Sequence, residues 1–164
     1  MAPQTTPFDD QQVKIGRFFI RHLSKANVAL FKATNGRLGR VWHLKNERPT
    51  LTGPEICLLT TTGRKTGEER VAPLLFMRDG ADVVVVASQG GMPKNPPWYL
   101  NLKADPEVKI QFRATADPYV ARLADTAEKA RLWPRLVEMY SDFETYQERA
   151  GDREIPVVIC TPAG

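Results

Sequence analysis

Residues 56–102 decide the fold, and they read ICLLTTTGRKTGEERVAPLLFMRDGADVVVVASQGGMPKNPPWYLNL. Three apolar runs rich in β-branched side chains cover residues 56–61, 71–77 and 83–87, and glycine-containing turns separate them. This succession of runs and turns predicts an antiparallel meander. Basic, polar and aromatic residues gather in the turns, so we expect the chemistry of the protein there rather than on the strands.

The rest of the chain adds shorter strands and helices. Residues 108–114 alternate apolar and polar side chains, residues 119–124 do so more weakly, and residues 155–160 form a closing apolar run. Residues 126–140 and 142–148 have helical patterns, and the first of them opens on Thr126 as a cap. Together these segments predict an α+β fold built on a small, mostly antiparallel barrel of about six strands, with an N-terminal helix and late helices beside it.

The size of the chain is that of one domain. Its 164 residues, 42% of them hydrophobic, can bury an ordinary core without metal or disulfide bonds. We expect one globular unit, with residues 1–53 as an N-terminal extension and residues 54–164 as the barrel domain. Cys57 and Cys160 fall in predicted strands outside any CxxC pair, which indicates buried thiols in a reducing compartment. No long apolar run and no secretory signal pattern occurs, so we expect a cytoplasmic protein.

Residues 11–34 predict a basic amphipathic helix. Nine Lys/Arg against three Asp/Glu give the first 53 residues a charge of +6, although the whole chain carries only +4. One alternative is peripheral contact of this helix with an anionic membrane; the other is packing of its apolar stripe on the barrel. Nucleic-acid binding is not expected, because no aromatic residues are interleaved with the bases as stacking platforms. The apolar stripe consists of Ile15, Phe19, Leu23, Ala26 and Leu30, and the basic face of Arg17, Arg21, Lys25 and Lys32.

Residues 60–70 form a basic glycine turn. Its two glycines allow a tight turn in which backbone N–H groups converge, and Arg64, Lys65 and Arg70 add fixed positive charge. Such a turn can bind a phosphate or carboxylate, although a solvated hairpin has the same composition. The P-loop spacing G-x-x-x-x-G-K-[ST] is absent.

Residues 87–99 form a second candidate site. Gly90 and Gly91 follow the valine-rich run and would let a flat ligand approach the backbone closely. Trp98 and Met92 could supply an apolar wall, and Ser88 and Asn95 could orient the ligand. The alternative is a surface loop that Trp98 anchors in the core.

The late helices carry an aromatic row with phenol groups at its ends. Trp133, Tyr140, Phe143 and Tyr146 recur at spacings of seven, three and three, which places them along one side of helical structure. The row forms either the wall of a pocket or part of the core.

Hydrolase and metalloenzyme functions find no support in the sequence. His22 and His43 are the only histidines, and neither lies near a serine nucleophile or a metal-ligand partner. No G-x-S-x-G, H-E-x-x-H or paired-carboxylate pattern occurs. No metal site is expected.

Five motifs follow one another along the chain: LLTTTGRKTG, the R-V-x-P-L of residues 70–74, VVVASQGG, KNPPWYLNL and the terminal IPVVIC. Taken together they resemble the deazaflavin-dependent nitroreductase family, which comprises split β-barrel reductases that use coenzyme F-420. The resemblance implies that Arg64, Lys65 and Arg70 bind the anionic tail of the coenzyme, and that Ser88, Gly90, Gly91 and Trp98 flank its ring. The other coenzyme positions that it implies are Thr66, Gly67, Pro73, Leu74, Ala87, Gln89, Lys94, Asn95, Pro97 and Asn101.

The resemblance also implies a hydride transfer from the reduced coenzyme to a quinone, an activated enone or a nitro-type acceptor. Tyr140, Tyr146 and Ser88 are then the catalytic proton or hydrogen-bond donors, and Phe143 and Trp133 belong to the substrate pocket. Phe143 stands where the family pattern has a tyrosine, which disfavours nitroimidazole reduction, and Gln89 replaces a lysine. The alternatives are an FMN-dependent reductase and a non-catalytic deazaflavin or lipid carrier. The protein is expected to be a monomer or a homodimer.

Overall fold

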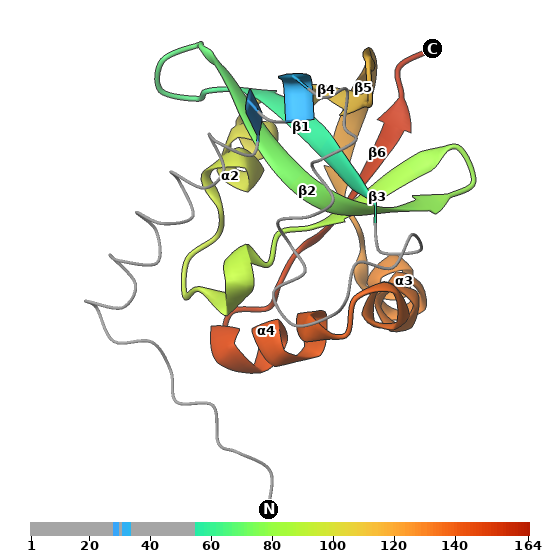
Figure 1. Ribbon diagram of the computed structural model, residues 1–164. Coiled ribbons are helices and arrows are strands. Elements are labelled where there is room, and N and C mark those ends of the chain that lie inside the picture. The colour runs from blue at the N-terminus through green and yellow to red at the C-terminus, as the bar shows by residue number, and fades with distance from the viewer. Residues whose placement is uncertain (1–27, 30, 34–54) are drawn as a thin grey trace, which may run out of the picture.

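The computed structural model describes residues 28–29, 31–33 and 55–164. Six antiparallel strands form a closed barrel in the order β1-β2-β3-β6-β5-β4 (Figure 1). The predicted fold class is confirmed. In chain order the elements are β1 (Ile56–Thr62), β2 (Glu69–Asp79), β3 (Asp82–Val86), the 3-10 turn η2 (Gln89–Gly91), α2 (Pro97–Ala104), β4 (Glu107–Phe112), β5 (Thr115–Leu123), α3 (Thr126–Met139), α4 (Asp142–Ala150) and β6 (Val157–Pro162).

The barrel closes through β1, which pairs with β2 on one side and with β4 on the other. Leu58 faces Pro73 in the first pairing and Gln111 in the second. The alternation along β1 separates two environments: Cys57 and Leu59 point into the barrel core, whereas Leu58 packs in a separate cluster outside it.

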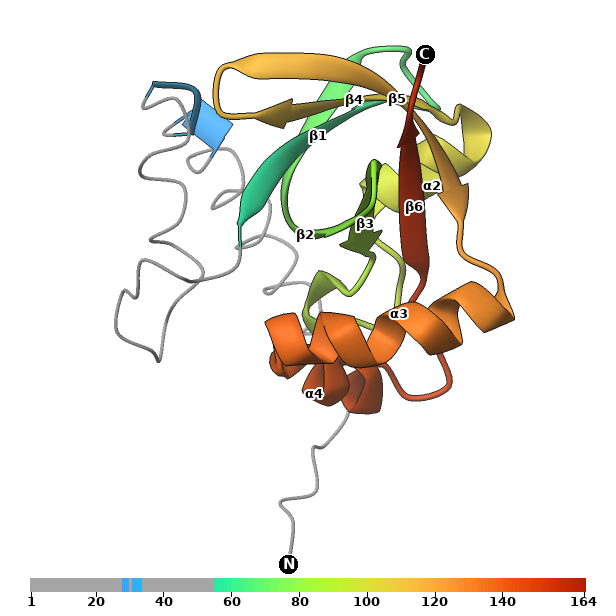
Figure 2. The same cartoon turned by 90° about the vertical axis from the view of Figure 1, so that its right-hand side faces the viewer.

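The helices α3 and α4 cover one outer face of the barrel, below β3 and β6 in both views (Figures 1 and 2). The valines of β3 therefore meet apolar partners on both faces: Val83 and Val85 belong to the barrel interior, whereas Val84 and Val86 pack with the late helices. Burial on both faces explains why this strand shows no alternation in sequence.

The cap of α3 differs from the predicted one. The N-cap is Asp125, not Thr126: Asp125 Oδ1 accepts from the Glu128 backbone N–H at 2.8 Å, and the Glu128 side chain accepts from the Asp125 N–H at 3.0 Å. The prediction of Thr126 was wrong because the reciprocal pattern needs an acid three residues after the cap, and Glu128 satisfies that spacing only from Asp125.

The described end of the predicted N-terminal helix packs on the barrel. Residues 28–29 and 31–33 are helical, and Phe31 is 2% exposed against Ile56 and Leu58. All five residues of the predicted apolar stripe lie outside the described residues. Among the helices that the structure describes, none is long and apolar enough to cross a bilayer.

The two cysteines are free and buried in strands β1 and β6. Burial raises the pKa of the Cys57 thiol far above its usual range, and it raises that of Cys160 to about 12. Both thiols are therefore protonated and unreactive in the folded protein.

Candidate functional site

The basic glycine turn links β1 to β2 through its own backbone hydrogen bonds. Gly63 N–H donates to Glu68 O at 2.8 Å, and Gly67 N–H donates to Gly63 O at 2.7 Å. Gly67 has a φ of +69°, a conformation that favours glycine. The turn is therefore a compact, ordered platform for the exposed side chains of residues 64–66.

The three bases of this turn make different interactions. The Arg64 guanidinium donates to Asn101 Oδ1 at 3.1 Å and so points to α2. Arg70 pairs with Glu68 and also donates to Thr66 Oγ1 at 3.3 Å. Lys65 is exposed and has no partner among the described residues. Arg64 and Lys65 thus keep charge available to an anion, whereas Glu68 neutralises Arg70.

Asn101 acts as a buried connector between α2 and this turn. It is only 4% exposed, and its Oδ1 also accepts from the Arg64 backbone N–H at 3.3 Å. Its Nδ2 donates to Thr61 Oγ1 at 3.2 Å. With both ends of its amide in use, Asn101 fixes the position of Arg64.

The second predicted site, residues 87–99, contains an unusual backbone. Three successive residues have positive φ: Gln89 at 48°, Gly90 at 65° and Gly91 at 78°. This conformation is sterically unfavourable for Gln89, which has a Cβ atom, but not for the two glycines. Its Oε1 is buried and has no hydrogen-bond partner among the described residues. A strained residue with an unpaired acceptor is typical of a ligand-binding loop.

Gly91 joins this loop directly to α4. A Cβ at position 91 would lie 2.7 Å from Tyr146 O and 2.7 Å from Arg149 Cβ. Only glycine permits this approach, so the loop and the helix that carries Tyr146 form one packed unit. At Gly90, by contrast, nothing lies within 4 Å of an added Cβ, and the backbone there is open.

The late helices place two phenols side by side. Tyr140 and Tyr146 hydroxyl oxygens are 3.2 Å apart, and Tyr140 O–H donates to Asp142 Oδ2 at 2.9 Å. Because Tyr140 gives its single hydroxyl proton to Asp142, the proton between the two tyrosines belongs to Tyr146. Burial, and next the bond with Tyr146, raises the pKa of Tyr140, which keeps this phenol protonated across the physiological range.

The other aromatic candidates are mainly packing residues. Phe143 is 4% exposed beneath the phenol pair, with ring centroids 5.2 Å from Tyr140 and 6.4 Å from Tyr146. Trp133 is half-buried, 6.4 Å from the Phe143 ring. Trp98 is 8% exposed in the barrel core, which matches the anchored-loop alternative.

The remaining predicted coenzyme residues differ in exposure. Ser88 and Asn95 are half-buried, and Ser88 flanks η2. Lys94 and Pro97 are exposed and Pro73 is buried opposite Leu58. Ala87 belongs to the barrel core and Leu74 packs against it.

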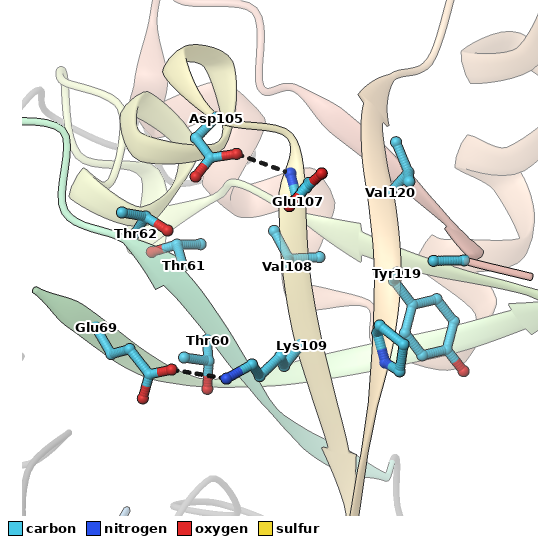
Figure 3. Close-up of a pocket in the computed structure, with 12 residues that line it drawn as sticks. Thr60, Thr61, Thr62, Glu69, Asp105, Glu107, Val108, Lys109, Tyr119 and Val120 are labelled. Carbon is cyan, nitrogen blue, oxygen red and sulfur yellow. Dashed lines mark hydrogen bonds and ion pairs between the residues drawn. The ribbon is translucent and has the colours of Figure 1, made fainter. Parts of the chain in front are cut away.

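A cavity of about 360 Å³ lies between β1, β4 and β5 and borders both ends of the basic glycine turn, at residues 60–62 and at Glu69 (Figure 3). None of the predicted ligand-binding residues lines it. Its acids, Glu69, Asp105 and Glu107, outnumber its one base, Lys109, which pairs with Glu69 at 2.8 Å. This charge makes the cavity a poor site for an anionic coenzyme.

The chain matches the F420H(2)-dependent quinone reductase family over residues 23–162. It is 38% identical over 157 residues to an F420H(2)-dependent quinone reductase of Mycobacterium tuberculosis, covering 90% of this chain and 97% of the relative. The chain belongs to this family.

Two solved structures support the assignment. One, an F420-H2 dependent reductase, is 40% identical with a TM-score of 0.59 and covers 64% of this chain and 92% of its own. Another, described as a domain-swapped dimer, is 33% identical with a TM-score of 0.60 and covers 88% of this chain and 98% of its own. The expected deazaflavin-dependent oxidoreductase on a split barrel, with coenzyme F-420 as its cofactor and a quinone as acceptor, is confirmed.

The residues of the reductase fit a flat, anionic coenzyme. Gly90 leaves open backbone for a ring, and Gln89 has an acceptor that a ring N–H can satisfy. Arg64 and Lys65 supply exposed positive charge for an acidic tail. These features agree with the predicted roles, which remain predictions for the individual residues.

Sequence reasoning missed two polar residues of the reductase, Asp142 and Arg153. Arg153 lies between α4 and β6. Its guanidinium forms hydrogen bonds to residues that precede it in the chain by 58 to 66 positions. No periodicity or local motif reveals so distant a contact. Asp142 could have been found from its position two residues after Tyr140, beside the aromatic row.

Proposed function

We propose that hydride transfer from reduced coenzyme F-420 to a quinone takes place where η2 meets α4. The observation that carries this proposal is the contact between Gly91 and the backbone of Tyr146, because it packs the coenzyme loop against the helix that carries this phenol. Ser88, Gly90 and Gly91 then border the ring, and Arg64 and Lys65 attract the anionic tail.

When bound, the coenzyme supplies a hydride, and the protein must orient the acceptor and supply one proton. A quinone that gains a hydride becomes a hydroquinone anion, and one proton completes the hydroquinone. Tyr146 is our candidate donor because its backbone contacts the loop at Gly91. Its hydroxyl can be reprotonated through Tyr140, whose oxygen lies 3.2 Å away. Asp142 is exposed and connects this pair to solvent.

Tyr146→Phe tests this role. We expect kcat/KM for menadione to fall about 100-fold, the low end of general acid catalysis, while the Kd of the oxidised coenzyme changes less than about twofold. Steady-state oxidation of reduced coenzyme and fluorescence titration measure the two quantities.

Tyr119→Phe is the matched control, since this tyrosine lies in the barrel core. An unchanged kcat/KM in Tyr146→Phe would remove this residue from the mechanism. Wild-type protein that binds FMN instead of the deazaflavin, with flavin absorption at about 450 nm, would contradict the coenzyme assignment.

We further propose peripheral membrane contact through residues 11–34. Its support is the charge of +6 in the first 53 residues, which favours binding to an anionic lipid surface. Co-sedimentation with anionic vesicles should fall when Arg17 and Arg21 are replaced by Glu in the full chain; equal partitioning would contradict the contact.

We also propose a homodimer, since the solved relative described as a domain-swapped dimer covers 88% of this chain. Light scattering after size exclusion measures the mass directly. A mass of 18.4 kDa at all concentrations would show a monomer instead.

A further inference from the structure

We propose that Arg153 is the positioning residue of the coenzyme loop: it holds residues 87–95 in the conformation that binds coenzyme F-420. The inference rests on the proposed function, because that function assigns this loop to the coenzyme. Arg153 itself lies outside every motif that indicated the function.

The guanidinium of Arg153 bonds the loop along its length. Its Nε donates to Met92 O at 2.8 Å, and its Nη2 donates to Ser88 O at 2.8 Å. Its Nη1 donates to Ala87 O at 3.2 Å and to Asn95 Oδ1 at 2.9 Å. One side chain therefore ties together both ends and the middle of the segment. Lysine has three donors on a single nitrogen and cannot reproduce this planar fork.

The loop requires such support because its conformation is strained. Gln89 has a φ of +48° in front of two glycines with positive φ. A residue in this region persists only where the surrounding structure fixes it. The fixed points here are Gly91 on α4 and the four hydrogen bonds from Arg153, so the loss of the fork should let the loop relax.

Arg153 is in turn held by α4. Gln147 Nε2 donates to Arg153 O at 3.0 Å, and Gln147 Oε1 accepts from Ile155 N–H at 2.8 Å. The carboxamide of Gln147 thus sets the path of the α4–β6 connection from which Arg153 reaches the loop. The same helix carries Tyr146, so a single element positions both the acceptor side and the coenzyme side of the site.

The charge of Arg153 points to a role beyond loop packing. Its hydrogen-bond acceptors are three carbonyls and one amide, and no carboxylate pairs with it in the described part of the chain. A half-buried cation without a counter-ion favours an anionic ligand beside it. Reduced salt-sensitivity of binding is therefore expected when this charge is removed.

The test compares Arg153→Lys, which keeps the charge, with Arg153→Met, which removes it. Fluorescence titration with oxidised coenzyme F-420 should give a Kd about tenfold weaker for Lys and weaker still for Met. The kcat for menadione at saturating coenzyme should stay within about threefold for Arg153→Lys. Hydrogen exchange should quicken in residues 87–95 of Arg153→Lys, whereas the barrel strands keep their protection.

Arg131→Lys is the matched control, because it removes a guanidinium of α3 that pairs with Asp79 at the end of β2 instead of with the coenzyme loop. Its Kd should stay within about twofold of wild type. If Arg153→Met does not fold, Gln147→Ala disturbs the same connection without touching the loop, and it should weaken binding about three- to tenfold.

Wild-type protein that binds the coenzyme, with Arg153→Lys and Gln147→Ala binding it within twofold of wild type, would overturn the role of Arg153 alone. Wild-type protein that does not bind the coenzyme would overturn the proposed function, and this inference with it.

Discussion

Replacement of Gly91 by Ala should be markedly more destabilising than replacement of its neighbour Gly90. Both glycines have positive φ, so a side chain at either position costs about 1–2 kcal/mol in backbone strain. At Gly91 the new Cβ would also lie 2.7 Å from Tyr146 O and from Arg149 Cβ, whereas at Gly90 it meets nothing within 4 Å. Overpacking of this kind costs about 1–3 kcal/mol.

The expected loss of unfolding free energy is therefore about 1–2 kcal/mol for Gly90→Ala and about 2–5 kcal/mol for Gly91→Ala. The entropy that alanine removes from the unfolded chain is common to both variants and cancels in the difference. Urea unfolding followed by circular dichroism measures the two values, with equal m-values as the check on two-state behaviour. A difference below about 0.5 kcal/mol would refute the close packing of the loop on α4.

Two further predictions concern connections between elements. Asn101→Ala should cost about 1–3 kcal/mol in urea unfolding, since it removes the bonds to Arg64 and Thr61 from a buried position; unchanged stability would show that the connector is dispensable. Asp79 pairs with Arg131 and Arg135, which lower its pKa to about 2. Because this pKa lies below that of the unfolded chain, the stability that Asp79 contributes is complete above about pH 4 and is lost as the pH falls toward 2. Because the arginines are about half exposed, each pair should contribute no more than about 1 kcal/mol, and Asp79→Asn should flatten this part of a Tm–pH profile; an equally steep profile in the variant would contradict the assignment.

The strands were predictable because their signals are local. The apolar runs of residues 56–61 and 71–77 fall within β1 and β2, and the Asp79-Gly80 turn joins β2 to β3 as expected. Here periodicity, β-branched content and turn residues all indicate the same structure. The order of the strands in the closed barrel was harder to predict from the sequence, because the pairing of β1 with β4 joins residues about 50 positions apart.

The site was predictable as a set of motifs but not as a geometry. The sequence placed Arg64, Lys65 and Arg70 together, yet a neighbouring acid decides which of them keeps its charge free: Arg70 pairs with Glu68 across the turn. Trp98 shows the same limit, because an aromatic residue beside a glycine loop can face a ligand or the core, and its 8% exposure places it in the core. Long side chains that reach across the fold leave no periodic trace.

The two buried thiols give this protein an internal reporter. Cys57 and Cys160 lie on different strands inside one closed barrel, so a labelling reagent reaches either sulfur only after strands separate. Thiol modification would then run at the rate of barrel opening, with no probe added to the chain. Bound coenzyme should lower the rate of thiol modification by the same factor by which it favours the closed barrel.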